Sequence, residues 1–381
     1  MAVPRPVRKV PFFDWAALFR EHRDDYVRIF AETADRGGFI LQRDVEEFET
    51  ALRGVTGSRH AVALADCTNA MSLGLRALGI GPGDEVLIPS HTFLATAQAV
   101  VYAGATPVPV DIDARNLMDA AATEAAITPR TRALMPVQVN GTTADMDALG
   151  DVARRHGLAL VEDSAQALGA TYKGRQAGTF GAWGAFSFYP SKTLGGFGDA
   201  GALVTDDDEI AAGVRAMRNH GSGVDKVIPA DTTVWGTNSR IDNIHAAILA
   251  YKLTRHYDAD IARRRAIAAR YDSALADIEE VARPAAPGAD PERFDVFQNY
   301  EIETRRRDAL RAHLAEDGIG TILQWGGTAI HQFRGLGFTQ TPPRADAFFR
   351  RCLLLPMNHL LSDDDVDHVG ASVRRFFGRP A

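Results

Sequence analysis

Short runs of apolar residues that end in polar residues recur through the first half of the chain. They occupy residues 61–64, 83–89, 107–113, 132–137, 158–163 and 185–188. An apolar run of this length is typical of a strand that is buried on both faces of a sheet. Helical segments separate several of these runs. The alternation of strand and helix therefore predicts a largely parallel sheet with helices on both faces.

Helical patterns precede and follow this predicted sheet. Near the N-terminus, apolar positions at helical spacing are supplied by Trp15, Leu18, Phe19, Tyr26, Ile29 and Phe30. Gly37 and Gly38 end this pattern, and a second helix begins near Val45. A long helical pattern then runs from about Ile241 to Ala276. We expect the N-terminal aromatic residues to pack in the core rather than to bind a ligand.

The C-terminal third of the chain has a separate pattern. Pro284, Pro287 and Pro291 mark a boundary after the long helix. Beyond it we expect a strand at Val296–Glu301, a helix at Arg307–Glu316, a strand at Thr321–Leu323 and a last helix capped by Ser362 and Asp365. This order predicts a smaller α/β domain. We expect a large domain with an N-terminal helical leader at residues 1–250, and a connecting helix with the small domain at residues 251–381.

Composition narrows the class of protein. The chain has 381 residues, of which 46% are hydrophobic and 24% charged, so it is long enough for two domains with substantial cores. Its net charge of -7 argues against a nucleic-acid partner. The two cysteines, Cys67 and Cys352, are too few for a disulfide framework, and no Cys/His cluster has the spacing of a metal site. With no long apolar run, we expect a cytoplasmic enzyme without a membrane partner.

Two of the predicted strands end in residues that can do chemistry. The first delivers Asp163 and Gln166, and the second delivers Ser187 and Lys192. Carboxyl ends of neighbouring parallel strands meet at one edge of a sheet, where ligands bind. A lysine that loses hydration there lowers its pKa and can act as an amine nucleophile. Taken singly, each residue is more often a solvated strand end or a cap.

The combination is more informative than either residue. Pyridoxal phosphate needs a lysine that binds it covalently and a carboxylate that keeps its pyridinium nitrogen protonated. Lys192 and Asp163 are of the required types. Competing motifs fail, because the glycines at 195, 196 and 198 do not follow a first strand, and Ser191-Lys192-Thr193 lacks the glycines of a Walker loop.

The residues around these two positions carry a resemblance to a known family. The matching segments are Glu162-Asp163-Ser164-Ala165-Gln166-Ala167, Gly169-Ala170, Gly178, Phe186-Ser187-Phe188-Tyr189-Pro190-Ser191-Lys192 and Gly198-Asp199-Ala200-Gly201-Ala202. They closely resemble the sugar aminotransferases of the DegT/DnrJ/EryC1/StrS family, from about Gly38 to about Met357. The resemblance implies an α/β protein of the pyridoxal-phosphate-dependent, aspartate aminotransferase (type I) fold.

The resemblance also implies roles for individual residues. Lys192 and Asp163 would be catalytic: Lys192 binds the cofactor and moves protons, and Asp163 pairs with the ring nitrogen. The expected cofactor-binding residues are Thr68, Asn69, Phe93, Asp163, Gln166, Ser187, Lys192 and Asn238. In the family, Thr68 and Asn69 occupy the place of a phosphate cradle at a helix N-terminus, Ser187 holds the phosphate, Phe93 stacks on the ring and Gln166 contacts its hydroxyl side. Asn238 would reach the cofactor of a neighbouring subunit, which implies a homodimer with shared sites.

Three departures from the family pattern concern positions beside this site. Cys67 replaces the usual glycine of the cradle, and Ala200 replaces a glycine after Asp199. Where the family commonly has Val-His-x-x-Gly, this chain has Val137-Gln138-Val139-Asn140-Gly141. No role of the family's histidine can therefore be transferred to Gln138.

The function that the resemblance implies is transamination. An amino donor, by resemblance L-glutamate, would give its nitrogen to the keto group of a nucleotide-activated deoxysugar, with pyridoxamine phosphate as the second form of the cofactor. Three alternatives within the family stay open: a cyclitol aminotransferase that uses glutamine, an enzyme that makes an aromatic amino acid precursor, and a pyridoxamine-dependent sugar dehydratase, against which Lys192 argues. A non-catalytic regulator is an alternative from another class. Substrate choice would depend on Phe39, His91, and the loops at 220–235 and 324–332.

Overall fold

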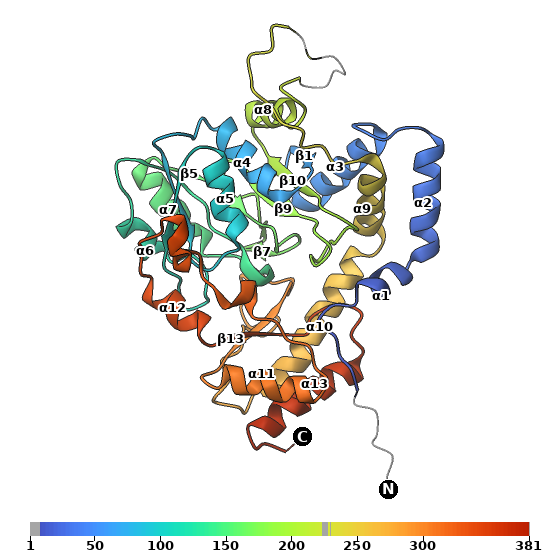
Figure 1. The fold of residues 1–381 in the computed structure, drawn as a ribbon, viewed down its shortest axis with the longest axis vertical. Helices are drawn as coiled ribbons and strands as arrows, with labels where there is room; N and C mark the ends of the chain where they lie inside the picture. The colour runs from blue at the N-terminus through green and yellow to red at the C-terminus, as the bar shows by residue number, and fades with distance from the viewer. Residues whose placement is uncertain (1–7, 223–227, 229, 381) are drawn as a thin grey trace.

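The computed structural model describes residues 8–222, 228 and 230–380, and a central sheet crosses its upper part (Figure 1). The strands of this sheet are β1 (His60–Leu64), β2 (Glu85–Pro89), β3 (Thr106–Val110), β4 (Thr131–Leu134), β5 (Ala159–Leu160), β6 (Glu162–Asp163), β9 (Gly184–Ser187) and β10 (Gly201–Thr205). Two four-stranded parts, β3-β2-β4-β5 and β1-β10-β9-β6, join where Val137 bridges Asp163. β10 is antiparallel to both neighbours, and the other strand pairs described here run parallel. The predicted, largely parallel sheet is confirmed.

Helices cover both faces of the sheet, as the βαβ pattern predicts. They are α3 (Arg43–Thr56), α4 (Cys67–Ala77), α5 (Leu94–Tyr102), α6 (Ala120–Ala125), α7 (Met146–His156), α8 (Asp208–Arg218) and α9 (Asn243–Arg255). Alternate residues of β1 point to opposite sides: Val62 and Leu64 pack with α4, α5 and α8, whereas Ala61 and Ala63 pack with α3 and α9. A third apolar cluster lies between β2, β4 and α7. The sheet is therefore buried on both faces, which explains its apolar strand sequences.

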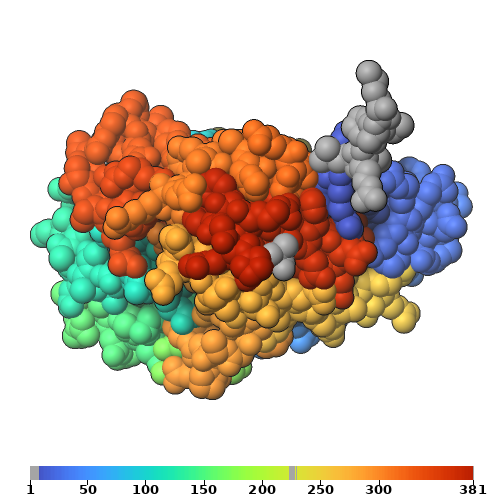
Figure 2. Space-filling view, turned by 90° about the horizontal axis from the view of Figure 1, so that it is seen from below, coloured from blue at the N-terminus to red at the C-terminus, as the bar shows by residue number. Residues whose placement is uncertain are grey.

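The lower part of the molecule is formed largely by the C-terminal residues. It contains α10 (Tyr257–Leu275), β12 (Tyr300–Glu303), α11 (Arg307–Glu316), α12 (Pro343–Phe349), β13 (Cys352–Leu355) and α13 (Asp363–Phe376). β12 pairs antiparallel with β13, and α10 packs along α13. Seen from below, orange and red C-terminal residues cover much of this face (Figure 2). The helix at Arg307–Glu316 and the cap of the last helix by Ser362 and Asp365 match the sequence prediction.

Some predicted elements differ in detail. The long helix at 241–276 is two helices, α9 and α10, interrupted at His256, whose ring stacks on His22 at 3.9 Å. The N-terminal pattern is likewise two helices, α1 (Trp15–Arg20) and α2 (Arg23–Asp35). The predicted strand at Thr321–Leu323 makes only an isolated bridge from Ile322 to Leu354. The sequence did not predict the short strands β7 (Thr171–Tyr172), β8 (Arg175–Gln176) and β11 (Arg293–Phe294).

The N-terminal segment lies against the C-terminal part of the chain. Val10 forms a parallel bridge with Ile319 and belongs to the same apolar cluster as Tyr271 and Leu353. Phe12 accepts a hydrogen bond from the side chain of Asn358, 3.2 Å away. This contact brings the residues that follow Phe12 close to the edge of the central sheet. The division of the chain at residue 250 stays a prediction. No helix of the described residues is long and apolar enough to cross a membrane.

One glycine lets the sheet approach the start of α4. An added Cβ atom at Gly201 would lie 2.4 Å from the backbone carbon of Asp66 and 2.4 Å from the backbone nitrogen of Cys67. Backbone atoms at this distance cannot move aside without displacing α4. The glycine of β10 therefore fixes the position of the helix N-terminus that the sequence assigns to phosphate binding.

Gly201→Ala should destabilise the protein by about 1–3 kcal/mol, the usual cost of overpacking a close contact. The matched control is Gly213→Ala inside α8, where the added Cβ would meet only the Ala77 side chain at 3.7 Å. That variant should gain about 0.5–1 kcal/mol from helix propensity. Chemical denaturation of both variants measures the difference, and equal stabilities would contradict the close-contact argument.

Candidate active site

A cavity of about 470 Å³ opens at the carboxyl ends of the central strands. Six of the residues that the sequence proposes as catalytic or cofactor-binding line it: Thr68, Phe93, Asp163, Gln166, Ser187 and Lys192. They come from the start of α4, the start of α5, and the segments after β6 and β9. The topology of the sheet, rather than nearness in the sequence, brings them together.

Lys192 lies on the loop that follows β9, and neighbouring elements fix this loop. The side-chain amide of Gln298 donates to the Ser191 carbonyl at 2.6 Å. The ammonium group of Lys252 donates to the Gly195 carbonyl. Burial lowers the pKa of the Lys192 amine, and the charge of Asp163 opposes this shift. A lowered pKa increases the fraction of the amine that is neutral and nucleophilic near neutral pH.

Asp163 ends β6 and is 4% exposed. Its Oδ2 accepts a hydrogen bond from the Thr96 hydroxyl at 2.7 Å, and its Oδ1 accepts one from the backbone N–H of Ala165 at 3.1 Å. Burial raises the pKa of this carboxyl, whereas the Thr96 hydrogen bond and the charge of Lys192 lower it. A buried acid and a half-buried amine therefore line one cavity, and desolvation disfavours the charged form of each.

The first turn of α4 supplies unpaired backbone donors at the edge of the cavity. Asp66, and not Thr68, is the N-cap, and its side chain accepts from the backbone N–H of Asn69 at 2.7 Å. The N–H groups of Cys67 and Thr68 lie before Asn69 in the first turn, where a helix offers its N–H groups no intrahelical acceptor. Such groups, with the positive end of the helix dipole, favour a phosphate. Ser187, which also lines the cavity, adds a hydroxyl.

Asn69 is turned away from this role. Both its backbone N–H and its side-chain amide donate to the carboxylate of Asp66, the latter at 2.6 Å. It is absent from the residues that line the cavity. The sequence match of Asn69 to the phosphate cradle therefore identifies the helix turn, and its assignment as a cofactor contact stays a prediction.

Phe93 presents a flat apolar surface to the cavity. It is the N-cap of α5, and 55% of its surface is exposed. A phenylalanine that packs in a core would be buried, whereas Phe93 is exposed at the cavity. Its ring is therefore free to stack on an aromatic ligand. Together with Asp163, Lys192 and the first turn of α4, Phe93 provides what pyridoxal phosphate requires. The residues present therefore fit this cofactor.

Gln166 is held in one orientation by Asn140, which lies in the loop after β4. Its Oε1 accepts a hydrogen bond from the backbone N–H of Asn140 at 2.7 Å. Because the oxygen is engaged in this way, the NH2 end of the amide is left for the cavity. Gln138, at the place of the family's histidine, is instead buried and structural. Its amide donates to Glu162 at 2.8 Å and accepts from the backbone N–H of Ala144 at 2.8 Å.

Asn238 does not line the cavity of this chain. It is exposed, and its backbone forms an isolated bridge with Asn219. An exposed asparagine there is compatible with a contact to a second subunit, which stays a prediction. The same loop carries Trp235, 90% exposed. Within the 220–235 segment expected to influence substrate choice, residues 223–227 and 229 lie outside the described residues.

The sequence did not predict every residue that lines the cavity. Phe12 and Phe13 do so, although the N-terminal aromatics were expected to be core packing. The signal that could have revealed them is weak: two adjacent phenylalanines outside any helical pattern. Gln298, Asn299 and Leu354 of the C-terminal part also line the cavity. Their approach depends on contacts that are distant in sequence.

The other candidate residues have structural surroundings. His91 is 1% exposed and packs against the rings of Trp325 and Phe348. His331 is fully buried, and its Nε2 contacts the carboxylate of Asp346 at 2.8 Å. Phe39 is half-exposed and does not line the cavity. Among the described residues, no group of three or more His, Cys, Asp or Glu side chains could hold a metal ion.

Comparison with known proteins identifies the family. The model of the DegT/DnrJ/EryC1/StrS aminotransferase family matches residues 21–374. A dTDP-3-amino-3,4,6-trideoxy-alpha-D-glucose transaminase of Streptomyces venezuelae is 42% identical over 97% of both chains. The crystal structure of S. venezuelae DesV in complex with a ketimine intermediate has a TM-score of 0.91, with 41% identity over 98% of this chain and 100% of that one.

A more distant solved structure has the same fold. NtdA from Bacillus subtilis with bound cofactor PMP has a TM-score of 0.90 and 27% identity, and the match covers 99% of this chain and 87% of that one. The resemblance stated from the sequence is thus confirmed, and so is the expected aminotransferase fold. The chain belongs to the DegT/DnrJ/EryC1/StrS aminotransferase family.

Proposed function

We propose that this protein is a pyridoxal-phosphate-dependent transaminase that moves an amino group from L-glutamate to the keto group of a nucleotide-activated deoxysugar. The observation that carries the proposal is the convergence of Lys192 and Asp163 on one cavity beside the exposed ring of Phe93. The name of the S. venezuelae relative, a transaminase of a dTDP-linked sugar, supports the substrate class. The similarity to NtdA, whose structure holds PMP, supports the cofactor.

The cavity residues divide the work of holding the cofactor. The first turn of α4 and the Ser187 hydroxyl would bind its phosphate, and Phe93 would pack on one face of its ring. Asp163 would pair with the ring nitrogen and Gln166 would donate its NH2 group to the ring hydroxyl. When bound, pyridoxal phosphate supplies an electron-withdrawing ring that accepts the electron pair left at the donor's Cα. The protein orients this ring and excludes water from it.

Lys192 performs the proton transfers. Its Nζ would take the proton from the Cα atom of the amino donor and deliver it to the C4′ carbon of the bound cofactor. Burial suits it to this task, because it lowers the pKa of the amine and so favours the neutral base. In the second stage the same Nζ works in reverse on the keto-sugar. One amine therefore serves both half-reactions.

Lys192→Ala should abolish turnover, with a loss of at least about a hundredfold, the lower end of what a positioned acid–base group contributes. The variant should still bind pyridoxamine phosphate, because the residues proposed for phosphate and ring remain. The measurement is steady-state turnover with L-glutamate and a panel of nucleotide keto-sugars. Lys173→Ala, on the exposed surface, is the control and should keep full activity. Normal turnover of the Lys192 variant would refute the assignment.

We expect the ionised Asp163 carboxylate to lower the stability of the apoprotein but to raise that of the cofactor-loaded enzyme. Burial raises its folded-state pKa above the ordinary value, so the unfolded chain loses this proton first as the pH rises. Stability of the apoprotein therefore falls across the interval between the two pKa values. A cationic ring nitrogen beside Asp163 would offset this cost by pairing with the carboxylate.

Asp163→Asn should consequently make the apoprotein more stable relative to wild type as the pH rises above 3.8, the ordinary pKa of an aspartate. Addition of pyridoxal phosphate should raise the melting temperature of the variant less than that of wild type, and turnover should fall. Thermal unfolding of both proteins, with and without cofactor across pH 5–8, measures both the higher stability of the variant apoprotein and its smaller gain on loading. An equal gain on loading would remove Asp163 from its role.

The proposal includes a homodimer whose active sites are shared. Asn238 is exposed and does not line the cavity of its own chain, which suits a residue that contacts the cofactor phosphate of a partner subunit. In a two-fold symmetric dimer such a contact occurs twice. Each site then combines Lys192 from one subunit with Asn238 from the other.

Mixing two inactive variants tests the shared site. Asn238→Asp would place a negative charge beside the phosphate, and Lys192→Ala removes the amine. In a hybrid dimer one site carries both changes and the other carries neither. After unfolding and refolding of an equal mixture, about a quarter of wild-type activity should return, because half of the dimers are hybrids with one intact site. No recovery, with hybrids present by native mass spectrometry, would contradict sharing.

The alternatives make different experimental demands. A sugar dehydratase of this family works without the lysine, and Lys192 is present. A cyclitol aminotransferase would respond to glutamine and a cyclitol ketone rather than to L-glutamate and a nucleotide sugar. A non-catalytic regulator would bind the cofactor without turnover. A cytoplasmic location, expected from the sequence, stays a prediction.

A further inference from the structure

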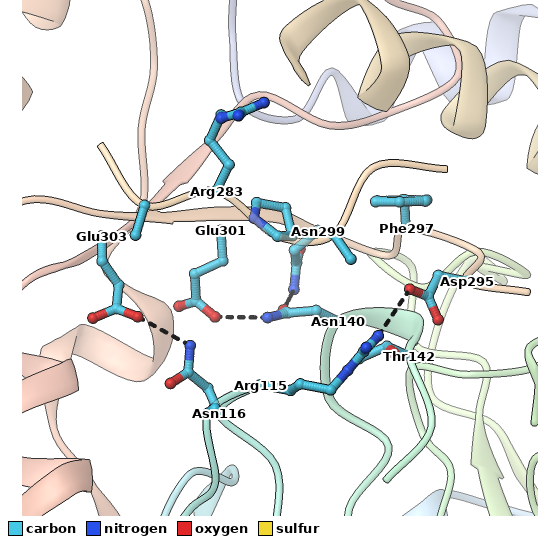
Figure 3. Close-up of a pocket in the computed structure, with 14 residues that line it drawn as sticks. Arg115, Asn116, Asn140, Thr142, Arg283, Asp295, Phe297, Asn299, Glu301 and Glu303 are labelled. Atoms are coloured by element: carbon cyan, nitrogen blue, oxygen red, sulfur yellow. Dashed lines mark hydrogen bonds and ion pairs between the residues drawn. The ribbon is translucent and has the colours of Figure 1, made fainter. Parts of the chain in front are cut away.

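A second, smaller pocket lies where the central sheet meets the C-terminal part of the chain. Its volume is about 200 Å³. Figure 3 shows Glu301 and Glu303 pointing from β12 into this pocket, toward the side chains of Asn140 and Asn116. Asn299 lines both this pocket and the active cavity. The residues between the two spaces therefore form a common wall.

Asn140 is the centre of this wall. Its side-chain NH2 donates to Oε2 of Glu301 at 2.6 Å. Its Oδ1 accepts hydrogen bonds from the amides of Asn299 at 2.8 Å and Gln324 at 2.9 Å. Its backbone has φ 60°, a left-handed conformation that asparagine tolerates better than other non-glycine residues. One side chain thus joins the loop after β4 to three residues of the C-terminal part.

The two ends of this network face the active cavity. The backbone N–H of Asn140 holds Oε1 of Gln166, so it determines which end of that amide reaches the cavity. Gln324 begins a segment in which Trp325, Gly326 and Gly327 all have positive φ, and Gln324 and Trp325 line the cavity. The segment is a short 3-10 helix, η2 (Gln324–Gly327), in which Trp325 and Gly326 depart from helical backbone angles. The Gln324–Asn140 hydrogen bond therefore anchors it.

Glu301 is the fixed acceptor on the other side of Asn140. Its side chain is 5% exposed, and it faces His91, Cys352 and Glu303 as well as Asn140. Burial raises the pKa of Glu301 to about 8 and lowers the pKa of His91 to about 4. His91 Nδ1 lies 2.7 Å from the Asn116 carbonyl and so donates to it, which leaves Nε2 as an acceptor 3.5 Å from Oε2 of Glu301. The Glu301 carboxyl is therefore largely uncharged at neutral pH, and its Oε2, which accepts from Asn140, fixes the direction of the Asn140 amide.

Resting on the proposed function, we propose that Asn140 is a positioning residue of the transamination site: held by Glu301, it orients the Gln166 amide toward the cofactor and anchors the Gln324–Gly327 segment beside the substrate space. The hydrogen bonds that join Asn140 to Glu301, Asn299, Gln324 and Gln166 carry this inference. Asn140 itself does not line the active cavity, so it acts through its neighbours.

Asn140→Gly removes the side chain without straining the backbone, because glycine readily adopts the same left-handed conformation. The variant loses the hydrogen bonds to Glu301, Asn299 and Gln324. We expect kcat/KM to fall about tenfold or more, the usual consequence of leaving buried polar groups unpaired. Titration of the apoprotein should give a correspondingly weaker affinity for pyridoxal phosphate, because without these three side-chain hydrogen bonds the loop no longer fixes the backbone N–H that holds Gln166. The KM for the keto-sugar should rise more than that for the amino donor.

The chain offers a matched control at the opposite wall of the same pocket. Asn116 also has a left-handed backbone, with φ 63°, and its amide donates to Glu303 of β12 at 3.2 Å. Among the described residues, its side chain forms no hydrogen bond with Gln166 or Gln324. Asn116→Gly therefore removes a comparable contact and should leave kcat/KM and cofactor affinity close to wild type.

The partner residue gives an independent test should Asn140→Gly fail to fold. Glu301→Ala should reproduce its losses, whereas Glu301→Gln should restore most of the activity, because its amide can accept from Asn140 and donate to His91 Nε2. The double variant Asn140→Gly/Glu301→Ala should lose less than the sum of the two single losses, since both changes remove the same Asn140–Glu301 hydrogen bond.

Unchanged kinetics and cofactor affinity in Asn140→Gly, or losses equal to those of Asn116→Gly, would overturn the proposal. So would additive losses in the double variant. A wild-type protein that binds pyridoxal phosphate but transfers no amino group would instead overturn the proposed function. In that case the cofactor titrations would still decide the role of Asn140.

Discussion

The structure depends on a pair of groups that folding alone would disfavour. Asp163 ends β6 and Lys192 lies in the loop after the adjacent strand β9; Asp163 is buried, Lys192 is half-buried, and desolvation shifts the pKa of each toward its neutral form. Desolvation makes each charged form costly, and their mutual attraction offsets only part of this cost. A protein retains such a pair when a ligand completes it. The proposed cofactor does so with a cationic nitrogen for the acid and a carbonyl for the amine.

The rest of the fold holds this pair in place. Parallel strands deliver both residues to one edge of the sheet, and helices bury both faces of that sheet. Gly201 allows β10 to approach the first turn of α4, so that the helix N-terminus reaches the same cavity. Contacts from Gln298 and Lys252 fix the loop that carries Lys192. The amine is therefore positioned by elements from three separate parts of the chain.

Local sequence patterns predict the features that depend on neighbouring residues, such as strands, helices and helix caps. The apolar strands, the helix at Arg307–Glu316 and the cap at Ser362 follow from periodicity and capping chemistry, and the motif around Lys192 identifies the family. The break at His256 was missed because the apolar spacing continues across it, while stacking on His22 is a tertiary contact. Phe13 at the cavity and the Asn140–Glu301 hydrogen bond, which joins residues 161 apart, were missed for the same reason. Long-range packing sets their positions, and one sequence carries no signal of it.

The central claim is that Lys192, and no other amine, binds the cofactor. The chain has only five lysines, at positions 9, 173, 192, 226 and 252, so the claim can be tested at every one of them. Pyridoxal-loaded protein would be reduced with borohydride, digested and analysed by mass spectrometry. The account predicts a reduced cofactor adduct on the peptide that contains Lys192 and on no other lysine. An adduct on Lys252, whose amine is also buried and has its pKa lowered to about 8, or the absence of any adduct, would contradict it.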